Sequence, residues 1–360
     1  MTPISSRKQQ HVEISLTKNV TFHTKSSGFE RWDFLHNALP EINFSEVDPS
    51  TLFLGKKISW PFMISSMTGG YAKAERINQQ LAEVCKQKNI ALGVGSQRQA
   101  SESGQFHRSY SIVREIAPGI PIFGNIGAAE VANLSDPSPM KRMIDLIQAD
   151  GFAVHLNPLQ ELLQPEGNPN FNGVLRGIEM LVTSLSIPVI VKEIGAGISG
   201  DVARRLANVG VTIIDVAGAG GTSWAGVEII RRNDGSRKKI QGHDSRKKNP
   251  LTPNAEKFWD WGIPTVDALT TVGRLKQEFS SLKIIASGGI SNGLDGAKAI
   301  ALGADFFASA RPVLQALVHG GTETALRLLN QWEWEIKSAM FLTGSRTIAE
   351  LQKQKLFSRP

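Results

Sequence analysis

Residues 151–161 read Gly-Phe-Ala-Val-His-Leu-Asn-Pro-Leu-Gln-Glu, and their character changes half-way along. Residues 151–154 are apolar and typical of a buried strand, and Pro158 prevents that strand from continuing. Four polar side chains follow the apolar part within seven positions: His155, Asn157, Gln160 and Glu161. A buried strand that ends in such a cluster indicates either the rim of an active site or a polar loop, and the rest of the chain has to decide between them.

The same unit, a short apolar run followed by an amphipathic segment, recurs about every 30 residues from Pro61 onward. We predict eight strands from these runs, at residues 62–65, 90–94, 121–124, 152–155, 189–192, 211–216, 283–286 and 304–308. They are apolar throughout, as strands buried on both faces are. Helices are predicted at residues 74–88, 202–209, 296–302 and 313–341. Eight strands that alternate with helices predict the α/β class and a (β/α)8 TIM barrel, with an open doubly wound sheet as the alternative.

The 360 residues divide into an N-terminal extension, residues 1–60, which lacks the repeat, and a barrel, residues 61–360. A hydrophobic share of 41% and a charged share of 20% are ordinary for a globular protein. The single cysteine, Cys85, excludes an internal disulfide framework, which fits a reducing, cytoplasmic setting. No apolar signal segment opens the chain, and no run is long and apolar enough to span a bilayer. We therefore expect a cytoplasmic protein without a membrane partner.

Positive charge is concentrated in residues 231–248, which hold eight Lys and Arg residues against two acidic ones, although the whole chain has a net charge of only +7. We interpret this segment as a mobile loop inserted after the sixth strand, because it is polar and lacks apolar periodicity. A lid over an anionic ligand is a second interpretation. A nucleic-acid-binding function is disfavoured, because no aromatic residue is interleaved in the segment and the rest of the chain is close to neutral.

The chemistry of a barrel lies at the carboxyl ends of its strands. The ends of the first five predicted strands offer neutral hydrogen-bonding groups, small residues and one fixed cation, which suit the ring of a flavin. These residues are Met67, Thr68, Gly69, Ser96, Asn125 and Lys192. Lys192 would stabilise an anionic reduced ring, and the alternative for it is an ion pair with Glu193 or Glu161.

The last three strand ends are rich in glycine and small residues, at 218–222, 287–290 and 309–311. Glycine lets backbone N–H groups approach a phosphate closely, and barrels often bind phosphate after strands seven and eight. We therefore predict a phosphate site at these loops. Its candidate residues are Thr222, Gly288, Gly289, Ser309 and Ala310.

Together these motifs resemble those of the FMN-dependent type 2 isopentenyl diphosphate isomerases. The matching segments run in order from residue 7 to about residue 311: Arg7-Lys8-x-x-His11, Met67-Thr68-Gly69-Gly70, Gly95-Ser96-Gln97-Arg98, Asn125, His155 to Glu161, Val191-Lys192-Glu193, Gly220-Gly221-Thr222-Ser223-Trp224 and Ser287-Gly288-Gly289-Ile290. The run at 155–161 and the start at 7–11 are specific, whereas the glycine loops occur in many FMN barrels. The resemblance implies interconversion of isopentenyl and dimethylallyl diphosphate by a 1,3-allylic proton shift. It also implies FMN reduced by NADPH or another donor, Mg²⁺, and a homotetramer or homo-octamer.

The resemblance implies a role for each candidate residue. Six are expected to bind the substrate and its diphosphate: Arg7, Lys8, His11, Arg98, His155 and Asn157. Glu161 is the expected Mg²⁺ ligand, because Mg²⁺ takes few carboxylates and shares phosphate oxygens. Gln160 is expected beside the carbon chain, with Lys192 holding the reduced ring anionic. Since a neutral amide is a poor acid and a poor base, we expect Gln160 to orient the substrate or relay a proton.

The nearest alternative is an FMN-dependent 2-hydroxy-acid oxidase or dehydrogenase, which is also a barrel. Such an enzyme needs a histidine base with an arginine partner after strand six. Residues 218–222 hold no histidine, and His243 falls in the basic segment, where we interpret it as an exposed loop residue.

Overall fold

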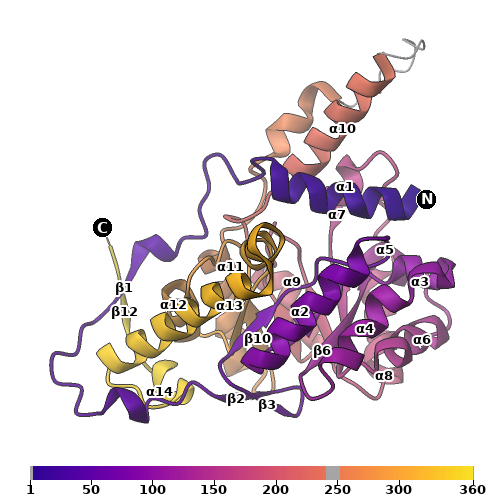
Figure 1. Ribbon diagram of the computed structural model, residues 1–360. Coiled ribbons are helices and arrows are strands. Elements are labelled where there is room, and N and C mark those ends of the chain that lie inside the picture. Colours follow the sequence, from indigo (N-terminus) through magenta and orange to yellow (C-terminus); the bar gives the residue numbers. More distant parts are fainter. Residues whose placement is uncertain (1–2, 241–251, 360) are drawn as a thin grey trace.

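The structure, a computed structural model, describes residues 3–240 and 252–359. Eight parallel strands form a closed barrel at its centre (Figure 1). In chain order they are β4 (Phe62–Ile64), β5 (Ala91–Gly93), β6 (Ile122–Gly127), β7 (Gly151–His155), β8 (Val189–Lys192), β9 (Ile213–Asp215), β10 (Lys283–Ala286) and β11 (Phe306–Ser309). The last strand pairs with the first, since Ala308 lies beside Met63. The predicted barrel and its eight strands are confirmed, and this closure excludes an open sheet.

Helices surround the barrel on its outside (Figure 1). The longer ones are α2 (Ala74–Lys88), α4 (Arg108–Ile116), α6 (Ser138–Ile147), α8 (Val174–Ser184), α9 (Gly200–Asn208), α11 (Thr265–Gly273), α12 (Gly293–Ala301) and α13 (Arg311–Leu342). Short elements fill the loops: α3 (Arg98–Glu102), η3 (Gly104–Phe106), α5 (Ala128–Val131), α7 (Pro158–Leu163), η4 (Thr252–Phe258), η5 (Arg274–Gln277) and α14 (Ile348–Leu351). All four predicted helices are confirmed, although α13 is interrupted at Gly320 and Gly321, where the backbone leaves helical geometry.

The interior of the barrel is apolar at its base. One side chain from each strand contributes to this plug: Met63, Ala91, Phe123, Ala153, Ile190, Ile213, Ile285 and Phe306, with Ala308 beside them. The plug is sealed from below by Phe53 and Ile58, which belong to the antiparallel hairpin of β2 (Thr51–Phe53) and β3 (Lys56–Ile58). Burying these side chains removes apolar surface from water and makes the barrel a packed core rather than a channel.

Two residues further along each strand the inner face becomes polar, because successive side chains of a strand alternate between its faces. We call these eight residues the upper layer; six are polar, Ser65, Asn125, His155, Lys192, Asp215 and Ser287, and Gly93 and Ala308 complete it. The candidate site is built above the upper layer.

The N-terminal extension packs on the barrel at its mouth, its side and its base. Helix α1 (Pro3–Thr17) lies across the mouth, where Val12 packs with Tyr71 and Leu314 (Figure 1). The extension continues through η1 (Phe29–Arg31), β1 (Trp32–Phe34) and η2 (Phe44–Glu46) to the hairpin at the base. Strand β1 pairs with the C-terminal strand β12 (Leu356–Ser358).

The prediction of a loop for the basic segment is wrong for residues 231–240, which belong to helix α10 (Trp224–Ile240). Val227 and Ile229 in the first part of this helix are buried, and the helix runs outward from the mouth of the barrel (Figure 1). A projecting helix end needs no apolar stripe, so its sequence shows no helical periodicity. Residues 241–248, including His243, lie outside the described residues. Among the residues that are described, no helix is long and apolar enough to cross a membrane.

Candidate active site

Two cavities open beneath α1 at the carboxyl ends of the strands, and each encloses about 1000 Å³ of space that is partly open to solvent (980 and 1160 Å³). We call them the polar cavity and the glycine cavity. The polar cavity is lined by thirteen of the predicted site residues: Arg7, Lys8, His11, Met67, Gly69, Ser96, Arg98, Asn125, His155, Asn157, Gln160, Glu161 and Lys192. The glycine cavity is lined by all five residues of the predicted phosphate site: Thr222, Gly288, Gly289, Ser309 and Ala310. Lys192 and Met67 line both cavities, so the two spaces meet at these side chains.

Thr68 is the predicted site residue that lines neither cavity. Its hydroxyl is hydrogen-bonded to Asn78 on α2, and its carbonyl oxygen accepts a hydrogen bond from the Gly95 N–H at 2.8 Å. The side chain therefore fixes the loop after β4, and a contact with a flavin at this position would have to come from the backbone of its neighbours.

The glycine cavity is built by loops whose backbones touch one another. Gly288 has a φ of +101° and Gly220 a φ of +119°, which side-chain-bearing residues rarely adopt. A Cβ atom on Gly288 would collide with the backbone of Gly218, and one on Gly220 with the backbone of Ser27. The hydroxyl of Ser309 donates to the Ile290 carbonyl at 2.8 Å, so it braces one of these loops. Only glycine fits these positions, and the exposed backbone suits a phosphate group.

The residues present fit a flavin mononucleotide. The wall of the glycine cavity includes two buried hydroxyl oxygens, on Ser15 and Ser66, that have no hydrogen-bond partner within the described part of the chain. Buried polar groups without partners are rare in folded proteins, so a bound ligand is the natural partner for them. Lys192 adds a cation where the two cavities meet. The phosphate would be held by the glycine loops and the ring by the groups around Lys192.

The mouth of the polar cavity carries three cations, Arg7, Lys8 and Arg98, with the carboxylates of Glu130 and Glu161 beside them. Lys8 is on α1, and its Nζ donates to the Ser96 carbonyl and to the Tyr110 hydroxyl, the latter at 2.8 Å. Burial and the neighbouring charge of Arg7 lower the pKa of Lys8 to about 7. Burial and the charge of Arg98 lower the pKa of Arg7 as well. A bound anion would relieve this repulsion around Arg7 and Lys8, whereas Arg98 already pairs with Glu130 at 3.0 Å.

His155 on β7 faces the same cavity as a neutral group. Its Nδ1 shares a hydrogen bond of 2.6 Å with the Asn125 Oδ1. Burial, followed by the charges of Lys192 and Lys8, lowers its pKa to about 3. His155 therefore binds a ligand at neutral pH by hydrogen bonding and not by charge.

This shift predicts a pH dependence of stability. Unfolding restores the ordinary pKa of His155 near 6.5, so between pH 6.5 and 3 the unfolded chain binds a proton that the folded protein does not. Stability is therefore lost as the pH falls through this window. Between pH 7 and 5 the free energy of unfolding should therefore fall by up to about 2 kcal/mol less in the His155→Gln variant than in the parent. Urea unfolding of the flavin-free proteins at both pH values measures this, and equal losses would contradict it.

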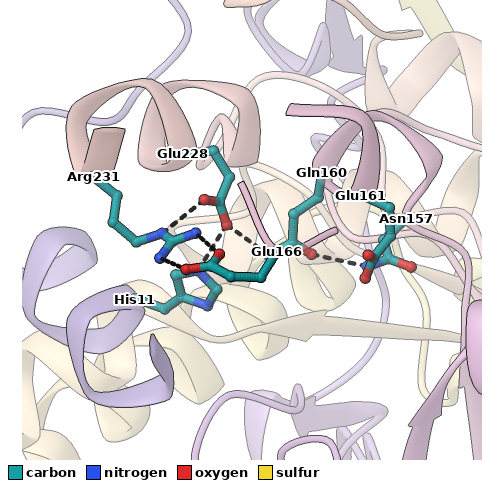
Figure 2. Close-up of polar contacts among 7 residues, drawn as sticks. All are labelled: His11, Asn157, Gln160, Glu161, Glu166, Glu228 and Arg231. Carbon is teal, nitrogen blue, oxygen red and sulfur yellow. Dashed lines mark hydrogen bonds and ion pairs between the residues drawn. The ribbon is translucent and has the colours of Figure 1, made fainter. Parts of the chain in front are cut away.

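Helix α7 organises the polar cluster that follows β7. Pro158 takes the first helical position, where its missing N–H costs nothing. Asn157 Nδ2 donates to Gln160 Oε1 at 3.0 Å and to Glu161 Oε1 at 3.1 Å (Figure 2). Glu161 Oε2 accepts the Asn168 N–H at 2.7 Å. The stretch is thus the rim of the site, with its amide and carboxylate groups held in fixed directions.

Glu228 on α10 is a functional candidate that the sequence analysis missed. It is fully buried, and His11 Nε2 lies 2.7 Å from its Oε1 (Figure 2). Gln160 Nε2 donates to the same oxygen at 3.4 Å, and Arg231 Nε donates to Oε2 at 2.8 Å. Burial alone would raise the pKa of Glu228, but the hydrogen bond and charge of His11 and the charge of Arg231 outweigh it and lower the pKa to about 2. Glu228 is therefore an anion throughout the neutral range.

Arg231 links this cluster to the loop after α7, because it also pairs with Glu166 at 2.6 Å (Figure 2). The sequence analysis assigned Arg231 to a mobile loop, whereas its side chain is only 9% exposed. A carboxylate inside an otherwise apolar helical turn, between Val227 and Ile229, was the signal that could have identified Glu228.

Over residues 3–103 and 142–358 the chain matches the family model of the FMN-dependent dehydrogenases. The isopentenyl-diphosphate delta-isomerase of Chlorobaculum parvum is 47% identical over 363 residues, which cover 100% of this chain and 98% of that protein. That of Rickettsia akari is 43% identical over 353 residues, which cover 98% of this chain and 97% of that protein. The chain belongs to the isopentenyl-diphosphate delta-isomerase family.

Solved structures that resemble this member of the isomerase family share its fold. A lactate oxidase of Pediococcus acidilactici has a TM-score of 0.67 at 15% identity, covering 100% of this chain and 95% of that one. A mandelate oxidase has a TM-score of 0.62 at 16% identity, covering 99% and 98%. At such identities the likeness extends to the barrel alone. The 2-hydroxy-acid oxidase alternative is not favoured, because the full-length relatives are isomerases and the loop at 218–222 holds no histidine base.

Glu161 is suited to a metal that takes few protein ligands. Within residues 3–240 and 252–359 no group of three or more His, Cys, Asp or Glu side chains could hold a metal ion by itself. The buried Oδ1 of Asn157, beside Glu161, has no hydrogen-bond partner among the described residues. A Mg²⁺ ion fits this donor set when phosphate oxygens and water complete its shell.

Proposed function

We propose that this protein interconverts isopentenyl and dimethylallyl diphosphate by a 1,3-allylic proton shift, with FMN in the glycine cavity and Mg²⁺ at Glu161. The observation that carries the proposal is the junction of the two cavities at Lys192. A cationic cavity suited to a diphosphate there adjoins a glycine-lined cavity suited to a flavin phosphate. The family membership supports the same substrate pair.

The substrate's diphosphate would be held by side chains from three parts of the chain. Arg7 and Lys8 reach the polar cavity from α1, Arg98 from the loop after β5, and His155 and Asn157 from the rim. Because Lys8 has a pKa of about 7, a bound diphosphate would favour its charged form and strengthen the contact. Glu161 would share Mg²⁺ with the phosphate oxygens. The carbon chain is then directed toward Lys192 and Gln160.

FMN, when bound in its reduced form, supplies a ring nitrogen that exchanges a proton with the alkene. Lys192 would hold the reduced ring anionic. Gln160 is poorly suited to move a proton, since its amide is hydrogen-bonded at both ends, by Asn157 and Glu228. We propose that Gln160 orients the substrate instead. His11 is better suited to exchange a proton, because Glu228 accepts its Nε2–H and so leaves Nδ1 for the ligand.

From the family resemblance we further propose NADPH as the reductant of FMN, a homotetramer or homo-octamer as the assembly, and the cytoplasm as the setting. The small-molecule substrate accounts for the cationic cavity, so no nucleic-acid partner is needed.

The proposal predicts a yellow protein whose absorbance bleaches with dithionite. The reduced protein, supplied with Mg²⁺ and isopentenyl diphosphate in deuterated water, should form dimethylallyl diphosphate that carries deuterium, with no net oxidation of substrate or flavin. NMR spectroscopy of the product detects both outcomes. A colourless protein that cannot be reconstituted with FMN would refute the proposal, as would turnover of 2-hydroxy acids without isomerisation.

A further inference from the structure

The upper layer contains one pair of opposite charges, of which the proposed reaction uses only the cation. Lys192 on β8 and Asp215 on β9 lie side by side in the register of the barrel. The Lys192 Nζ is 3.6 Å from the Asp215 Oδ2, and the two side chains are 7% and 4% exposed. Asp215 lines neither cavity, so it lies beneath their floor and does not reach a ligand.

The second oxygen of Asp215 connects this pair to the glycine cavity. The Ser287 hydroxyl donates to Asp215 Oδ1 at 2.6 Å, and the Ala217 N–H donates to the same atom at 3.2 Å. Ser287 lines the glycine cavity, and its carbonyl accepts the Gly218 N–H at 2.9 Å. The Asp215 carboxylate therefore contacts both the cation at the end of β8 and the loops at the ends of β9 and β10.

Of the ionisable groups described around Lys192, Asp215 is the one that forms an ion pair with it, although the charge of Lys192 also acts on the Glu193 carboxyl. The Glu193 carboxylate is directed into its own loop, where it accepts N–H groups of the backbone from Ile194, Gly195 and Ala196. Lys192 Nζ instead donates to the Glu193 backbone carbonyl at 2.6 Å. His155, the neighbour on β7, is neutral at pH 7, and Lys8 is a cation. The Glu161 carboxylate of the same cavity is engaged by the Asn157 side chain and the Asn168 N–H. Asp215 is thus the counter-charge of Lys192.

We propose that Asp215 is a positioning residue that keeps the ammonium of Lys192 charged and directed at the junction of the two cavities. A buried ammonium without a counter-charge gives up its proton, because burial penalises the charged form. The carboxylate beneath the floor therefore allows Lys192 to meet a flavin ring as a cation. This inference rests on the proposed FMN site and names the group on which its electrostatics depend.

Proton uptake on reduction of the bound FMN tests the proposal. Dithionite, acting through mediator dyes, delivers two electrons to the ring. In the parent one proton should accompany them to a ring nitrogen, while the second ring nitrogen stays deprotonated beside the Lys192 ammonium. In Asp215→Asn a second proton should accompany the electrons, either to the Lys192 amine or to that second ring nitrogen. The slope of the midpoint potential against pH should therefore double, since each proton contributes about 30 mV per pH unit in a two-electron couple.

Two controls separate this role from a structural one. Asparagine has the shape of aspartate and can still accept the Ser287 hydrogen bond, so the loops of the glycine cavity should keep their positions. Ser287→Ala removes that bond but keeps the carboxylate, and it should retain the slope of the parent. Asp305→Asn removes a carboxylate of similar kind, paired with Lys276 at 2.6 Å and remote from both cavities, and it should also retain that slope.

A second measurement needs no flavin. In urea unfolding of the flavin-free protein, Asp215→Asn alone should lower the free energy of unfolding strongly. In a Lys192→Met background the same change should lower it much less, because the unpaired cation is then absent. A one-proton slope in Asp215→Asn, or an equal cost in both backgrounds, would overturn the proposal. If the parent itself fails to bind FMN, the proposed function fails first, and the unfolding cycle still decides the pairing.

Discussion

Glu228→Gln should lower kcat by about 10²- to 10⁴-fold while FMN and substrate remain bound. The carboxylate is fully buried and is the partner of the His11 Nε2. A neutral amide in its place can no longer stabilise a protonated His11, and it can present an N–H group to the ring and so reverse the tautomer. Rates of isomerisation under reducing conditions, with the flavin content of each preparation, measure the effect.

Glu166→Gln is the matched control for this change. Glu166 belongs to the same ion-pair cluster, through Arg231, but its side chain is 52% exposed and lines neither cavity. Its variant should keep kcat within a few-fold of the parent, because it loses the same formal charge without touching His11 or Gln160. Equal losses in the two variants would show that the cluster only supports the fold.

Gly288→Ala should weaken FMN binding by about 100-fold or more and yield largely colourless protein. The new Cβ would collide with the Gly218 backbone at a φ of +101°, so the loop has to move. Each hydrogen bond to a charged group contributes about 1.5–3 kcal/mol, and the displacement of two backbone donors therefore accounts for this loss. The ratio of flavin to protein absorbance, followed by FMN titration of the stripped protein, gives the affinity.

Gly303→Ala controls for backbone strain alone. Gly303 has a φ of +108°, close to that of Gly288, yet its Cβ would meet no atom within 4 Å. It follows α12, outside both cavities, so its alanine variant should lose stability but bind FMN as the parent does. Comparable loss of flavin from both variants would mean that backbone strain, and not the shape of the glycine cavity, governs FMN binding.

The sequence predicted the barrel because each of its strands is a separate apolar run. Most candidate site residues line the two cavities because strand ends converge. The two-residue alternation that turns Ile190 inward also turns Lys192 inward, so the position of this cation follows from the strand pattern alone. Its partner was mistaken for Glu193 or Glu161. Adjacent residues of a strand face opposite sides, whereas Asp215 lies on the same inner face of the neighbouring strand.

The contribution of α10 could not be predicted for a different reason. The basic part of its sequence has no apolar stripe, so the helical position of Arg231 gave no periodic signal. Glu228 was marked only by its apolar neighbours Val227 and Ile229, and its partner His11 lies far away in the sequence. The hydrogen bond between Thr68 and Asn78 could not be predicted for a similar reason, since it depends on how α2 packs. Contacts made between elements without a repeating pattern become visible only in three dimensions.

The hairpin of β2 and β3 limits how this enzyme can be divided. Phe53 and Ile58, which complete the core at the base of the barrel, come from the same sixty residues that supply α1 at its mouth. A chain cut at residue 61 would lose both the helix that covers the two cavities and the floor of its own core. The barrel is therefore not an autonomous module that could be transplanted or recombined without its leading segment, and engineering of this scaffold has to treat the two as a single unit.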